Sequence, residues 1–311
     1  MTISEHVTEF FGKPVEDFDP AKGLAKHPAW VYRIGLGFSN PAAWDARWQA
    51  FLKDPRASDV EALVIGTWGT DLYTGGHSSS APVKALVAAR AKLPRLKALF
   101  LGDIVYSESE MSWIPQSDVS PLWSAFPLLE EFRVRGASDL SLGAMNLDRL
   151  RSLSVETGGM QSSILDEILA SKLPSLEHLE LWLGTDEYGA DISAADLTPI
   201  LSGEKFPHLT YLGLRNSTIT DDLAAAVADA PILEKLEVLD LSLGTLSDAG
   251  AKSLLEFPLI ARLKRLDIHH HFVSPPMVEK LRALGIEVND ADPQEAEEDG
   301  DESYRHIYVS E

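Results

Sequence analysis

The stretch Leu173-Pro-Ser-Leu-Glu-His-Leu-Glu-Leu181 decides the fold, because its pattern returns along the chain. The pattern is an apolar residue, two further residues, Leu, two more residues and then apolar-x-apolar. Six other good copies begin at Leu93, Phe126, Leu147, Phe206, Leu233 and Ile260, and weaker ones lie at 31–36, 60–65 and 286–288. Seven good copies indicate an internal repeat, which takes precedence over any local prediction.

The closing triplets give the spacing of the repeat. Aligned on their first residue, the copies place these residues at equivalent positions: Ile34, Leu63, Leu99, Phe132, Leu153, Leu179, Leu212, Leu239, Leu266 and Ile286. The intervals are 29, 36, 33, 21, 26, 33, 27, 27 and 20 residues. Alternation of apolar and polar residues predicts a short strand at each triplet, and the longer intervals leave room for loop insertions.

The segments between the triplets carry helix signals. Asn40-Pro41 offers an N-cap and a proline at the first helical position, and apolar residues follow at helical spacing from Trp44 to Leu52. Similar signals lie at 163–169, 220–230, 247–255 and 274–284, where Ser or Thr provides the cap. Each repeat is therefore predicted as a strand followed by a helix, which buries its apolar face only by stacking on its neighbours.

With these repeats the chain resembles the leucine-rich-repeat family, and its Ser/Thr-Asp helix starts are similar to those of the ribonuclease-inhibitor-like branch, over roughly residues 31–288. The resemblance implies an α/β solenoid, a horseshoe with a parallel concave sheet and convex helices. The family usually has a ladder of Asn or Cys three residues after the triplet. Here Gly158, Gly184, Ser217 and Gly244 stand there, so we expect backbone groups or water to satisfy these turns.

Three regions follow from these patterns. Residues 1–57 are predicted as an N-terminal cap with the first strand–helix unit, residues 58–288 as the repeats, and residues 289–311 as an acidic linker and terminal strand. Nine acids and no Lys or Arg lie between Glu287 and Glu302. Such a composition predicts a mobile segment, after which Arg305–Glu311 regains a strand-like pattern and is expected to dock on the body.

The whole chain also resembles a group of uncharacterised bacterial cytoplasmic leucine-rich-repeat proteins. The features that carry this resemblance are the Phe10-Phe-Gly-Lys-Pro-Val15 start and the acidic linker followed by a short terminal strand. It implies an accessory or recognition protein with no assigned reaction, and it carries no site residues across.

Composition excludes several classes of function. The 311 residues include 48 acidic and 27 basic ones, and the net charge of −21 argues against nucleic acid or an anionic membrane as partner. The absence of cysteine excludes disulfides, thiolate metal sites and a cysteine nucleophile. Because the sequence has neither a long apolar run nor a signal-peptide start, we expect a cytoplasmic protein. We also expect no cofactor.

The predicted concave face provides the candidate site. Alternation places Ala62, Val64, Ala98 and Phe100 on a smooth apolar part of it, and Trp182, Tyr211 and Arg215 at the centre of its later part. These last three residue types dominate interface energies, so they are the predicted anchors. Further candidate contacts are Arg133, Arg135, Glu156, Glu180, Asp240, Asp267 and His269. An alternative remains: Trp182 folds over a neighbouring repeat, and the charges pair between strands.

The favoured function is a non-catalytic scaffold that binds another protein of basic or mixed charge, with an association rate that falls with salt. The alternative is an accessory subunit or a metal-dependent enzyme, since His269 and His271 on one strand would face the same way, beside Asp267. A purely structural homo-oligomer is the third hypothesis. Insertions around residues 68–80 and 103–120 could cover the concave face.

Overall fold

The computed structural model describes residues 2–36, 42–69, 72, 77–300 and 302–309. The chain forms two compact units. The N-terminal unit comprises Thr2–Val155 and Asp166–Pro174, and the C-terminal unit comprises Glu156–Leu165 and Ser175–Ser310.

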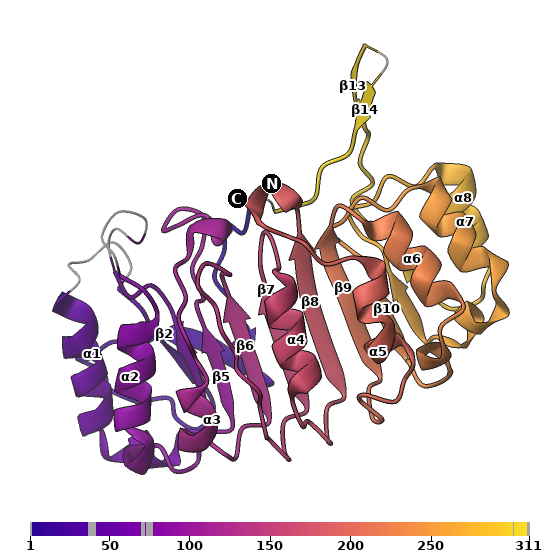
Figure 1. The fold of residues 1–311 in the computed structure, drawn as a ribbon. Coiled ribbons are helices and arrows are strands. Elements are labelled where there is room, and N and C mark those ends of the chain that lie inside the picture. Colours follow the sequence, from indigo (N-terminus) through magenta and orange to yellow (C-terminus); the bar gives the residue numbers. More distant parts are fainter. Residues whose placement is uncertain (1, 37–41, 70–71, 73–76, 301, 310–311) are drawn as a thin grey trace. The chain divides into compact units, whose positions relative to one another are not determined.

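The N-terminal unit is built on strands that follow one another in chain order. β1 (Glu9–Phe10) pairs antiparallel with β2 (Lys13–Asp17). Parallel pairing then continues through β3 (Val31–Ile34), β4 (Ala62–Ile65), β5 (Ala98–Leu101) and β6 (Glu131–Arg135), and β7 (Ser152–Glu156) comes next in the chain. The helices of this unit are α1 (Ala42–Lys53), α2 (Ser80–Ala88) and α3 (Pro121–Ala125), and they lie on one side of the strands (Figure 1).

The C-terminal unit repeats the same arrangement. Its parallel strands are β8 (His178–Gly184), β9 (Tyr211–Ser217), β10 (Val238–Asp240), β11 (Arg265–Asp267) and β12 (Glu287–Asn289). The helices along this part of the chain are α4 (Ser162–Ala170), α5 (Thr198–Leu201), α6 (Thr220–Ala228), α7 (Asp248–Glu256) and α8 (Pro275–Arg282).

Short 3-10 turns occur along the whole chain. They lie at Pro55–Asp59, Arg90–Lys92, Met111–Trp113, Asp186–Tyr188, Ala194–Leu197, Pro231–Glu234 and Pro258–Arg262. Within the described ranges, no helix has both the length and the apolar character needed to cross a membrane.

The strand register confirms the inner part of the predicted alignment. Leu63, Leu99 and Phe132 are register partners in the N-terminal unit, and Leu179, Leu212, Leu239 and Leu266 are partners in the C-terminal unit. The two end copies were misaligned by two residues, because Tyr32 rather than Ile34 pairs with Leu63, and Val288 rather than Ile286 pairs with Leu266. A shift of two keeps every side chain on its predicted face.

A ladder of serine and aspartate side chains joins the helix starts of neighbouring repeats. Asp221, at the start of α6, accepts hydrogen bonds from the Ser247 backbone N–H at 2.8 Å and from its hydroxyl at 2.6 Å. Asp248 of α7 binds Ser274 in the same way, at 2.7 and 2.8 Å, and Asp191 binds Ser162. This ladder lies at the helix starts, not at positions 158, 184, 217 and 244, where the family usually has Asn or Cys. The cap predicted at Asn40-Pro41 lies outside the described residues.

The turn at Gly184 is satisfied by backbone groups, as predicted, whereas at the Ser217 turn the Thr220 and Thr245 hydroxyls also donate to the Ser217 carbonyl. Gly184 has φ of 74° and leaves no room for a Cβ against the carbonyl of Gly158, so glycine is required there. The Thr185 N–H donates to that carbonyl at 2.8 Å.

The apolar strand face of the N-terminal unit is not an exposed surface, which corrects the prediction for Ala62, Val64, Ala98 and Phe100. These side chains form one buried cluster with Phe10 and Val31, and Val7, Phe11 and Val15 pack against it. The rings of Phe10 and Phe100 are 6.1 Å apart. The N-terminal segment therefore covers this face, and part of the insertion predicted around residues 68–80 lies outside the described residues.

The acidic linker contains structure that its composition did not predict. β13 (Glu297–Asp299) and β14 (Glu302–Tyr304) form an antiparallel hairpin that projects from the C-terminal unit (Figure 1). The residues that follow dock on the body, as expected, and bury Ile307 and Val309. The prediction of a strand there was wrong for residues 305–309, because their backbone groups bond to turn residues and side chains rather than to a strand.

We expect Asp221→Ala to lower the free energy of unfolding by about 2–3 kcal/mol, because the two donors of Ser247, the Gly250 N–H and Arg305 all lose a charged acceptor. Asp222→Ala is the matched control: it removes the same charge from the same helical turn, where the side chain is exposed. We expect the control to cost less than about 0.5 kcal/mol. Urea unfolding of both variants measures the difference, and equal losses would contradict the ladder.

Candidate protein-binding face

The strand face of the C-terminal unit, defined as the side of β8–β12 opposite the helices, carries two rows of side chains in register. The outer row consists of His178, Tyr211, Val238, Arg265 and Glu287. The inner row consists of Glu180, Gly213, Asp240, Asp267 and Asn289. The outer row is half-buried or exposed, whereas the three carboxylates of the inner row are buried. The outer row is thus the accessible part of this face.

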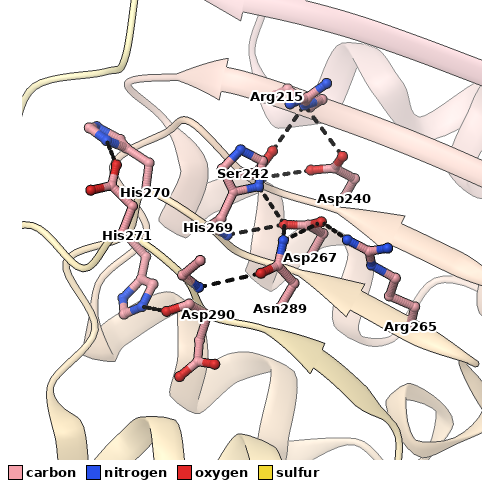
Figure 2. A network of polar contacts seen from close by, with 12 residues as sticks. Arg215, Asp240, Ser242, Arg265, Asp267, His269, His270, His271, Asn289 and Asp290 are labelled. Carbon is pink, nitrogen blue, oxygen red and sulfur yellow. Dashed lines mark hydrogen bonds and ion pairs between the residues drawn. The ribbon is translucent and has the colours of Figure 1, made fainter. Parts of the chain in front are cut away.

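Arg215 holds the inner row together at β8–β10. Its Nη1 donates to Glu180 at 3.1 Å, and its Nε donates to the Ser242 hydroxyl at 2.9 Å and lies 3.3 Å from Asp240 (Figure 2). The guanidinium also lies over the Trp182 ring, 5.0 Å from its centre. Because Glu180 and Asp240 come from strands on either side of β9, this one cation lies between two buried carboxylates and compensates part of their charge.

Trp182 does not have the exposure expected of a contact anchor. Its side chain is only 6% exposed, and its Nε1 donates to Glu180 at 2.7 Å. The structure therefore agrees with the alternative interpretation of this residue, in which Trp182 packs on a neighbouring repeat and the charges pair between strands. Its indole lies under Arg215 and orients the Glu180 carboxylate.

Tyr211, in the outer row, is held in place by the carboxylates that Arg215 joins. Its hydroxyl donates to Asp240 at 2.7 Å and lies 3.4 Å from Glu180, and its ring stacks on His178 with 3.8 Å between ring centres. A Cβ at position 213 would lie 3.1 Å from the Tyr211 ring, so Gly213 makes room for it. His178 and Gly213 were not among the predicted contact residues, although strand alternation places both on the same face as Tyr211.

The electrostatics of this cluster keep its protons in place. Burial raises the pKa of Tyr211, and the charges of Glu180 and Asp240 raise it further. Burial alone would lower the pKa of Arg215, but Glu180 and Asp240 more than compensate and raise it above its ordinary value. Tyr211 is therefore a neutral donor and Arg215 a cation near neutral pH. General acid–base catalysis needs pKa values near the working pH, and these two groups do not provide them.

Asp267 organises the other end of the strand face. It accepts hydrogen bonds from Arg265 at 2.6 Å, from the His269 ring at 2.6 Å and from the Asn289 amide at 2.8 Å (Figure 2). Burial would raise the pKa of this carboxyl, but the bonds from His269 and Asn289 hold it well below its ordinary range. The carboxylate therefore stays ionised and fixes Arg265 in the outer row.

The three histidines do not converge on a metal position. His269 binds Asp267, the Nδ1 of His270 lies 3.3 Å from Asp292, and the Nε2 of His271 lies 3.3 Å from the Asp290 carbonyl (Figure 2). The strand alternation assumed for them was wrong, because β11 ends at Asp267 and His270 has φ of 59°. Across the described part of the chain, no three His, Cys, Asp or Glu side chains are grouped as metal ligands.

The remaining predicted residues are not on this accessible row. Arg133 and Arg135 belong to the N-terminal unit, where Arg135 is buried, donates to the Ile104 carbonyl at 2.9 Å and lies 3.5 Å from Asp103. Arg133 lies over the Phe100 ring at 4.5 Å. Glu156 belongs to the C-terminal unit and is fully buried.

A crystal structure of a Bacteroides fragilis protein is similar to this chain, with a TM-score of 0.80 and 31% sequence identity over 89% of this chain and 76% of that one. The chain belongs to the family of that protein. Together with the repeating register and the strand–helix order, this similarity establishes a leucine-rich-repeat protein with an α/β solenoid fold.

A second solved structure, an internalin from Listeria monocytogenes, has a TM-score of 0.38 and 13% identity over 80% of this chain and 71% of its own. That similarity is too low to support a conclusion. No protein-family model matches the chain, and no curated protein matches it.

We expect Arg215→Met to lower the free energy of unfolding of this leucine-rich-repeat protein by about 3–5 kcal/mol, because it leaves Glu180 and Asp240 buried without their cation. Arg265→Met serves as the control, since the Arg265 side chain is 40% exposed against 16% for Arg215. The control should cost about 1 kcal/mol or less. Urea unfolding measures both, and similar losses would refute the role of Arg215.

Acid should weaken the Asp267 cluster in a defined direction. A carboxyl whose pKa is lowered by folding contributes stability that is complete above its unfolded pKa of about 4, and this contribution is lost progressively as the pH falls from there through the lower folded-state pKa. Asp267→Asn should therefore destabilise the protein more at pH 7 than at pH 3. Urea midpoints of wild type and variant at both pH values test this, with the exposed change Glu234→Gln as control. A difference independent of pH would count against the cluster.

Proposed function

We propose that this protein is a non-catalytic scaffold that binds another protein through the outer row of the C-terminal unit's strand face. The observation that carries the proposal is this row itself. An aromatic, an aliphatic and a cationic side chain, Tyr211, Val238 and Arg265, stand in register on three adjacent strands and remain half-exposed.

The residues beneath the outer row support it rather than make contact. The Tyr211 side chain is held by four residues, Trp182, Arg215, Glu180 and Asp240. Arg265 is held by Asp267, which also binds His269. A side chain already fixed in one orientation loses little conformational entropy when a partner binds. This arrangement favours a preorganised contact surface centred on Tyr211.

The charge of the chain favours a basic or mixed-charge partner. The net charge is −21, and Glu287 ends the outer row as an exposed carboxylate. Long-range attraction of this kind raises the association rate at low salt. The Tyr211 hydroxyl and the Arg215 guanidinium keep their protons near neutral pH because their pKa values are raised, so a binding role is the function that the site supports best.

Val238→Asp tests this function. It places a charge in the middle of the outer row without touching the bonds of Arg215 or Asp267, so we expect partner capture to fall by at least about tenfold. The measurement is affinity capture from a lysate of the source organism, at low and moderate salt, with quantification of the retained protein.

Ala249→Asp is the matched control, because it adds the same charge at an exposed position of α7 on the helix side. The control should capture as the wild type does. Equal capture by Val238→Asp would exclude the outer row, and no specific capture by the wild type would refute the scaffold function.

A further inference from the structure

A second contact region lies at the end of β9 and in the segments that follow β9, β10 and β11. We name it the tail groove; it consists of Asn216, Asp221, Leu243, Thr245 and His270, and residues 305–309 occupy it. Both the groove and these residues belong to the C-terminal unit.

Three residues of the groove are equivalent positions of successive repeats. Asn216, Leu243 and His270 are separated by 27 residues each, and all have left-handed φ values, of 49°, 65° and 59°. Left-handed backbone usually selects glycine. Here asparagine and histidine occupy such positions, and their side chains contact the occupying segment.

Each of the three positions bonds to the backbone of that segment. The Asn216 side chain donates to the Val309 carbonyl at 2.6 Å and accepts from the Val309 N–H at 2.9 Å. The Leu243 carbonyl accepts from the Tyr308 N–H at 2.9 Å, and the His270 Nε2 lies 3.2 Å from the His306 carbonyl. Successive repeats thus bond to successive peptide groups of residues 306–309, a segment that bends at Tyr308.

Side-chain contacts add selectivity to this backbone recognition. Arg305 donates to the Asp221 carboxylate at 2.9 Å and to the Thr245 carbonyl at 2.8 Å. Ile307 and Val309 are buried, and the Tyr308 ring meets the edge of His270 at 5.5 Å. The bound motif is therefore an arginine (Arg305) followed two and four residues later by aliphatic side chains (Ile307 and Val309).

The connection to the occupying segment does not depend on the repeats. β13 and β14 pair with each other. Between Glu297 and Arg305, every side chain that the structure describes is exposed. Residues 305–309 can therefore leave the groove without any change in the strand ladder, whose bonds they do not share.

We propose that the tail groove is a peptide-binding site whose built-in occupant is the chain's own residues 305–309. Its external ligand is a segment of a partner protein with arginine followed at the second and fourth positions by aliphatic residues. This site is separate from the strand face, and it does not depend on the function assigned to that face.

The test uses a fluorescently labelled peptide with the sequence of residues 302–311 and the full-length protein. Val309→Asp puts a carboxylate into a fully buried position and expels the built-in segment. An occupied site lowers apparent affinity in proportion to its occupancy, so this variant should bind the peptide at least about tenfold more tightly than the wild type in fluorescence anisotropy.

Asn216→Gly in the Val309→Asp background tells specific binding from nonspecific binding, because glycine accepts the left-handed φ and only the carboxamide is lost. We expect this change, and an alanine in place of the peptide's arginine, to weaken binding about tenfold or more. Val238→Asp on the strand face should leave peptide binding unchanged, which separates this test from that of the proposed function.

Circular dichroism establishes that the variants are folded, and Ile307→Ser replaces Val309→Asp if the latter unfolds. No binding by a folded, tail-released variant up to about 1 mM peptide, or binding insensitive to Asn216→Gly, would overturn the proposal. Light scattering that shows a wild-type dimer dissociated by Val309→Asp would place a second copy's segment in the groove and overturn the assignment of the built-in occupant.

Discussion

The register of equivalent aliphatic residues on neighbouring strands is the constraint on which the rest of the structure depends. Leu179, Leu212, Leu239 and Leu266 are partners and are fully buried. One strand and one helix cannot bury such residues alone, so each repeat is stable only against the next. Because side chains alternate along a strand, this same register places the polar residues of successive repeats in rows on the opposite face.

Rows of this kind bring like charges together, and the molecule resolves the conflict by sharing cations and donors. Glu180 and Asp240 would repel each other when buried, but Arg215 lies between them and Tyr211 donates to Asp240. Replacing such an ionic cluster by apolar residues is often neutral or stabilising, so stability alone does not explain its presence. What the cluster provides is a single orientation for Tyr211, and fixed orientation is what a contact surface requires.

The sequence was sufficient for features that depend on local pattern, and insufficient for features that depend on distant contacts. The strong copies of the repeat predicted the inner register correctly, whereas the weak copies around Ile34 and Ile286 lacked the leucines that fix alignment. Alternation placed Phe100 and Trp182 on the correct face but could not show that Phe10 covers one and that Arg215 lies over the other. The left-handed turns at Asn216, Leu243 and His270 carried no glycine, the usual signal of such a conformation.

Segments outside the repeats decide which surfaces of the strands and turns remain exposed. The N-terminal segment covers the apolar strand face of the N-terminal unit. In the C-terminal unit, residues 305–309 cover the turns that follow the strands, and the outer row of its strand face stays half-exposed. Residues 305–309 are linked to the repeats through Asp221, which accepts hydrogen bonds from both Ser247 and Arg305. A peptide that displaces Arg305 must offer its own cation to this half-buried carboxylate, because the neutral donors of Ser247 and Gly250 leave its charge uncompensated. The ladder that joins neighbouring helices thus also sets the chemistry that the groove can accept.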